Sequence, residues 1–199
     1  MVEVLETSYS IGKYKEKSSS CHPYTSYVNY YGAVKAEPFL TVSQPYYLKS
    51  SISFKFLSKY KFELPLEFDN LVKAIQKSES ILELADNWDN EDSKSYSEIT
   101  LLKSINFLTR CAIKIQKDLG ILIKTPHIFP GQNGSIDLLW NNCNSTLLIN
   151  FPEGNNNIAS FYGDDQKNSF IEGKFDFSKN NMGIIVFLKD ISTIDYVGK

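Results

Sequence analysis

The feature that most constrains this chain is a change of hydrophobic period near Gly120. Before Gly120, apolar residues recur at intervals of three and four, which places them on one face of a helix. These residues are Leu101, Ile105, Leu108, Ala112, Ile115 and Leu119. Ser95 and Glu98 form a capping-box pattern, and Gly120 suits the position after the last helical residue. The pattern predicts a helix over residues 95–119.

After Gly120 apolar residues recur at every second position, which is the period of strands with one buried face. The expected strands cover residues 136–140, 147–151, 158–162, 170–177 and 183–188, the last as a continuous apolar run. Short links rich in Asn, Gly and Asp separate them, so there is no room for crossover helices. The sequence therefore predicts an antiparallel meander of about five strands.

A second helical pattern follows Pro65, with a shared face interrupted by Ser78. Its members are Leu71, Ile75, Ser78, Leu82, Ala85 and Trp88. Because Ser80 and Glu83 form a further capping box, one continuous helix and two short helices with a kink near residue 78 fit equally well. The predicted fold class is α+β, with two helices packed on the meander.

Residues 1–64 differ from the rest of the chain. Nine of the twelve tyrosines fall there, and prolines interrupt any helical period. Residues 51–56 alternate like a strand. We expect a Tyr-rich N-terminal arm of strands and loops over residues 1–64, packed on an α+β core domain over residues 65–199. The alternative interpretation is a partner-binding arm, with Tyr30 and Tyr31 as candidate contacts.

Composition favours a cytoplasmic protein without a membrane segment. No apolar run approaches the roughly 20 residues that cross a bilayer, and the first residues lack the apolar stretch of a signal peptide. The net charge is −2, and Arg110 is the single arginine among 21 basic residues. Because arginine supplies most bidentate base and phosphate contacts, this composition weakens a nucleic-acid interpretation.

Two tryptophans and two aspartates are candidates for a binding surface. Trp88 and Asp89 end the first helical pattern, where they fit either a core plug with a cap or a surface anchor. Asp137 lies between residues that should face the helices, with Trp140 three positions further on. Asp137 is then either simply solvated or part of a polar groove on the open sheet face, shared with Asn150 and Ser160.

A pair of carboxylates, Asp164 and Asp165, follows Tyr162 and Gly163. Paired carboxylates hold divalent metals in hydrolases, and a metal site combining this pair with Asp86, Asp89 and Asp92 is one interpretation. A polar turn explains the pair equally well without a metal. Because nucleophile-elbow, P-loop, dinucleotide-binding and zinc-protease motifs are all missing, we assign no catalytic residue, no metal ligand and no cofactor.

Several short motifs occur in a fixed order: Leu84-Ala85-Asp86-Asn87-Trp88-Asp89, a helix, Pro126-x-Ile128-x-Pro130, Gly134-x-Ile136-x-Leu138-x-Trp140, Leu147-x-Ile149-x-Phe151 and Tyr162-x-Asp164-Asp165. This order resembles a family of small uncharacterised bacterial proteins found on plasmids and genomic islands. The resemblance covers about residues 80–176. It implies a mobile-element context, in which toxin–antitoxin pairs, immunity factors and defence accessories are common.

The interpretation that fits best is a non-enzymatic protein-binding or regulatory module, an antitoxin, immunity or defence component whose protein partner is encoded by an adjacent gene. The candidate surface comprises Trp88, Asp89, Asp137, Trp140, Tyr162, Asp164, Asp165, Tyr30 and Tyr31. Two alternatives stay open. One is a metal-dependent hydrolase or nuclease using clustered Asp residues, and the other is a nucleic-acid binder acting through the Lys-bearing arm.

Overall fold

The computed structural model describes residues 50–165 and 170–193; residues 1–49, 166–169 and 194–199 lie outside the described part. Its elements, in chain order, are β1 (Ser51–Phe56), β2 (Tyr60–Pro65), η1 (Leu66–Phe68), α1 (Asp69–Lys77), η2 (Ser78–Glu83), α2 (Glu98–Leu119), β3 (His127–Pro130), η3 (Gln132–Gly134), β4 (Ile136–Asn141), β5 (Thr146–Phe151), β6 (Ile158–Asp164), β7 (Phe170–Asp176) and α3 (Met182–Thr193). The α+β class is confirmed.

The main sheet has five strands in the order β3-β4-β5-β6-β7, and all neighbours are antiparallel. The predicted antiparallel meander is therefore confirmed, although one of its strands differs. β3 supplies the first strand, whereas residues 183–188 were predicted as a strand and belong to α3. That prediction was wrong because a short apolar run does not distinguish a strand from a buried helix.

The buried residues of α3 continue beyond the apolar run at residues 183–188, and their spacing is that of a helix. Its buried residues are Ile184, Ile185, Leu188, Ile191 and Ser192. They lie on one face of a helix, one and two turns apart. The Asn181 side-chain oxygen accepts a hydrogen bond from the Ile184 amide at 3.2 Å, which caps the start of the helix.

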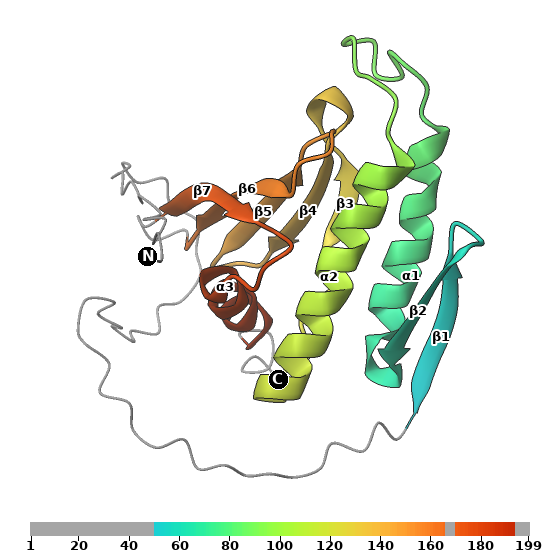
Figure 1. Ribbon diagram of the computed structural model, residues 1–199. Helices are drawn as coiled ribbons and strands as arrows, with labels where there is room; N and C mark the ends of the chain where they lie inside the picture. Colours follow the sequence, from blue (N-terminus) through green and yellow to red (C-terminus); the bar gives the residue numbers. More distant parts are fainter. Residues whose placement is uncertain (1–49, 166–169, 194–199) are drawn as a thin grey trace, which may run out of the picture.

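The helices lie on one face of the sheet (Figure 1). α2 contacts β4 and β5, α1 contacts β3, and α3 contacts both α2 and β5. Ile136, Leu138 and Trp140 of β4 are buried on this face, as the alternating pattern predicts. α2 is a 22-residue helix, and the predicted face from Leu101 to Ile115 is buried against the sheet.

The two predicted capping boxes do not form. Ser97 caps α2 instead of Ser95, because its side-chain oxygen accepts from the Ile99 amide. The Ser80 hydroxyl donates back to the Lys77 carbonyl oxygen at 3.0 Å. The chain tightens into a 3-10 helix at Ser78, so the kinked alternative for this segment is the observed one. Gly120 ends α2 with φ 69°, as predicted.

The β1–β2 hairpin forms a separate two-stranded sheet on the far side of α1 from the main sheet (Figure 1). The predicted strand over residues 51–56 is thereby confirmed. Phe54, Phe56 and Leu64 are buried in the same hydrophobic cluster as the helices. The hairpin therefore contributes to the core, while residues 1–49 of the predicted arm lie outside the described residues.

In the described ranges, we find no helix whose length and apolar character would let it cross a membrane.

Candidate functional site

The face of the sheet opposite the helices is left open by every helix that the structure describes (Figure 1). A row of polar residues crosses it, because the strand register places Asp137 beside Asn150, Asn150 beside Ser160, and Ser160 beside Lys174. Of the two sequence interpretations of Asp137, the polar-groove alternative placed Asp137, Asn150 and Ser160 on one shared face. Lys174 was missed, because its position depends on the register of β7, which the sequence pattern does not give.

A mostly apolar row runs beside the polar one. Leu139 pairs with Leu148, Leu148 with Tyr162, and Tyr162 with Glu172. Leu139 and Leu148 are partly buried, but neither belongs to the hydrophobic core. Tyr162 is 39 % exposed. The open face therefore carries apolar surface that no described helix covers.

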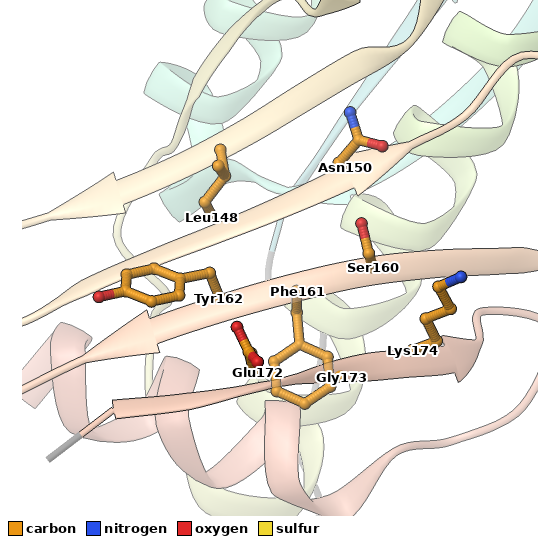
Figure 2. Close-up of a pocket in the computed structure, with 8 residues that line it drawn as sticks. All are labelled: Leu148, Asn150, Ser160, Phe161, Tyr162, Glu172, Gly173 and Lys174. Atoms are coloured by element: carbon orange, nitrogen blue, oxygen red, sulfur yellow. The ribbon is translucent and has the colours of Figure 1, made fainter. Parts of the chain in front are cut away.

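A shallow groove of about 450 Å³ follows these two rows across β5, β6 and β7 (Figure 2). It is lined by Leu148, Asn150, Ser160, Phe161, Tyr162, Glu172, Gly173 and Lys174. Figure 2 shows the side chains of Asn150, Ser160 and Lys174 along one side and those of Leu148 and Tyr162 along the other. The groove thus offers an apolar floor beside hydrogen-bonding groups.

Asp137 and Asn150 form a hydrogen-bonded polar pair on this face. The Asn150 side-chain amide donates to the Asp137 Oδ1 atom at 2.6 Å and to the Ser135 Oγ atom at 2.8 Å. Burial raises the pKa of the Asp137 carboxyl, while the Asn150 hydrogen bond acts in the opposite direction. Asp137 is therefore a partly desolvated carboxyl rather than a freely solvated one.

The turn before β4 packs against this pair. A Cβ atom placed on Gly131 would clash with the Ser135 hydroxyl oxygen and would lie 2.9 Å from the Asp137 Oδ2 atom. The Gly131 amide donates to the Ser135 carbonyl oxygen at 2.8 Å. Glycine therefore allows the backbone to approach the Asp137 carboxyl closely.

Trp88 and Asp89 lie in the loop between η2 and α2. Trp88 is 42 % exposed, and its Nε1 atom donates to the Tyr96 hydroxyl at 3.2 Å. The Tyr96 hydroxyl donates to the Gly131 carbonyl oxygen at 3.0 Å, so this loop is joined to the turn beside Asp137. The structure thereby links Trp88 to the Asp137 region, although Trp88 does not line the groove.

The aspartates of this loop hold its backbone. Asp86 accepts from the Ser95 amide at 2.7 Å, and Asp89 accepts from the Glu91 amide and the Ser93 hydroxyl. These hydrogen bonds lower the pKa of both the Asp86 and Asp89 carboxyls. Both carboxylates therefore stabilise the loop conformation by accepting hydrogen bonds from loop residues.

The remaining candidates are placed apart from one another. Trp140 is 1 % exposed and donates from Nε1 to the Lys124 carbonyl oxygen at 2.8 Å, which makes it a core residue. Asp164 ends β6, where its Oδ2 atom accepts from the Tyr162 hydroxyl at 3.2 Å, and Asp165 follows directly. Tyr30 and Tyr31 lie outside the described residues.

Within residues 50–165 and 170–193, no group of three or more His, Cys, Asp or Glu side chains is placed to hold a metal ion. The clustered-Asp interpretation required the loop aspartates and the Asp164–Asp165 pair to converge. In the described residues, Asp86 and Asp89 instead accept hydrogen bonds from Ser95 and Ser93 of their own loop.

Comparison with protein-family models, curated proteins and solved structures finds no match to this chain.

Proposed function

We propose that this chain is a non-enzymatic protein-binding module and that its partner packs on the open face of the five-stranded sheet. The observation that carries the proposal is the groove, in which partly buried Leu148 and exposed Tyr162 lie beside Asn150 and Lys174. A mixed apolar and polar surface of this kind is typical of protein interfaces, which combine an apolar centre with a polar rim.

The geometry favours a protein partner over a small ligand. Sites for small molecules are usually enclosed and cover most of the ligand surface. The groove here is a shallow depression on a sheet, with its floor formed by side chains of neighbouring strands. A folded surface or an extended segment laid across β5, β6 and β7 would cover Leu148 and Tyr162 together.

The Asn150 side chain on this surface is held in place by hydrogen bonds within the chain itself. Asn150 donates to both Asp137 and Ser135, so its amide holds one orientation. Preorganised polar groups favour binding because less side-chain freedom is lost when the complex forms. Asn150 is therefore the polar contact that we expect to set the orientation of the partner.

The partner that we propose is the product of an adjacent gene, consistent with an antitoxin, immunity or defence component of a mobile element. This step depends on the order of the Asn-Trp-Asp and strand motifs in the sequence. The open face supplies the surface, and the gene neighbourhood would supply the identity of the partner.

The test is co-expression with each neighbouring gene product, followed by co-elution in size-exclusion chromatography. Leu148→Lys should abolish co-elution because it places a charge on the apolar floor of the groove. Ile113→Lys is the matched control, since Ile113 is 40 % exposed on α2, away from the open face. Failure of every neighbour to bind, or equal loss of binding with both variants, would contradict the proposal.

A further inference from the structure

β7 is an edge strand of the main sheet, with β6 as its single partner among the described residues. An edge strand presents a row of backbone amides and carbonyls that are ready to pair with another strand. Natural proteins usually cover or blunt such an edge. β7 extends for seven residues, Phe170–Asp176, so it offers a full-length strand for pairing.

β7 carries two opposite charges on the same face, on either side of its central residue. Glu172 and Lys174 are exposed and project from the open face, with Gly173 between them (Figure 2). They make no ion pair with each other or with any other described residue. The sequence Glu-Gly-Lys is therefore complementary to itself when read in the antiparallel direction.

We infer that the chain forms a symmetric dimer through antiparallel pairing of β7 with the β7 strand of a second copy. With the two-fold axis at Gly173, Glu172 lies opposite the partner's Lys174, and Lys174 lies opposite the partner's Glu172. Opposite charges placed directly across two strands stabilise the pairing. The same two-fold axis makes the interface isologous, which is the commonest arrangement in dimers.

Charge also selects this register over its neighbours. The smallest slip that keeps side chains on matching faces is two residues. Slipping by two residues in one direction places Glu172 opposite the partner's Glu172, and slipping in the other places Lys174 opposite the partner's Lys174. Like charges directly opposite each other destabilise a strand pair. The register centred on Gly173 is therefore the one that β7 specifies.

The β7 side chains that face the helices are also compatible with the register centred on Gly173. Ile171 lies opposite the partner's Phe175, and this apolar pair faces the helices on both copies. Ile171 is partly buried in one copy, so pairing would remove more of its surface from water. Gly173 has no side chain to obstruct the axis, and the Phe161 ring fills the space beneath it.

The dimer would join two five-stranded sheets into one and set the two grooves on one continuous face. This inference goes beyond the proposed partner binding. Its failure is distinguishable from failure of that proposal, because Leu148→Lys and co-elution do not report on the β7 edge.

The test measures the dimer dissociation constant of the full chain by sedimentation across a concentration series. Glu172→Lys and Lys174→Glu should each weaken the dimer by about tenfold or more, since each converts two attractive pairs into two repulsive ones. Mixing the two variants should restore a heterodimer, because every cross-strand pair is then opposite in charge. Glu67→Lys is the control, with the same charge change on exposed η1.

Three results would overturn the inference. The first is a wild-type chain that stays monomeric at every concentration. The second is a dimer that Glu67→Lys weakens as much as Glu172→Lys does, which would indicate a general charge effect. The third is a mixture of the two variants that associates no better than either variant alone.

Discussion

Neighbouring residues of β5 provide a direct test of the two faces of the sheet. Ile149 is 0 % exposed and lies in the core beneath α2, whereas Leu148 lies partly buried on the open face. Both residues lose most of an aliphatic side chain when replaced by alanine. Ile149→Ala and Leu148→Ala therefore differ mainly in the face of the sheet that they change.

The expected magnitudes are well separated. Truncating a fully buried Ile removes its transfer free energy and leaves a cavity, which together lower the free energy of unfolding by about 3 kcal/mol. For a chain of this length that corresponds to a fall in Tm of about 6–12 °C. Leu148 is partly buried and does not belong to the hydrophobic core, so Leu148→Ala should lower the free energy of unfolding by about 1 kcal/mol or less.

The assay is urea denaturation followed by far-ultraviolet circular dichroism, with Tm as a second readout. For partner binding, we expect Leu148→Ala to have the larger effect of the two substitutions. It should weaken co-elution with the partner, whereas Ile149→Ala should leave co-elution intact at a temperature where that variant is folded. Equal destabilisation by the two substitutions, or a larger effect of Leu148→Ala on unfolding, would refute the assignment of an open face.

Two further substitutions test packing and charge. Gly163→Ala should lower the free energy of unfolding by about 1–3 kcal/mol, because the new Cβ atom would lie 2.9 Å from the Phe187 ring; Phe187→Leu in the same chain should recover part of the loss in Tm. Asp137→Asn should stabilise the fold at pH 7 and have little effect well below pH 3.8. Burial raises the pKa of the Asp137 carboxyl in the folded state above that ordinary value, so ionisation of Asp137 destabilises the fold as pH rises from the ordinary pKa through the raised one. An Asp137→Asn variant that resists urea no better than the wild type at pH 7 would contradict this prediction.

The long amphipathic elements of this fold were predictable from sequence because their periods are unambiguous. The face from Leu101 to Ile115 and the alternation in β4 and β5 each repeat several times, and a repeated pattern outweighs local exceptions. The boundary at Gly120 was also predictable, since the chain there adopts a positive φ that glycine accepts readily.

Short elements were harder to predict because several structures fit them. The run at residues 183–188 is apolar at every position, so it carries no period, and the spacing of Ile184, Leu188 and Ile191 becomes decisive only when the whole of α3 is considered. Ser95 and Ser97 both precede Glu98, and the choice of cap depends on the loop geometry that Asp86 fixes through the Ser95 amide.

The candidate site was partly predictable. The alternation of β4 and β5 placed Asp137 and Asn150 on one face, and short turns implied that they are close. The contributions of Glu172 and Lys174 required the register of β7, which depends on a link that includes residues 166–169. Trp140 was a surface candidate, but its side chain is 1 % exposed, and its hydrogen bond to the Lys124 carbonyl oxygen satisfies its polar atom inside the core.

The two proposals meet on one face of the sheet for a physical reason. A face that only met water would be expected to carry polar residues at most positions, yet Leu139 and Leu148 occupy the centre of this one, outside the core. The Asp137 carboxyl is partly desolvated there and accepts a hydrogen bond from the Asn150 amide, so part of the face is organised before anything binds. Pairing of β7 would place two such faces side by side, and a partner that bound both would gain affinity from the second contact without any new chemistry.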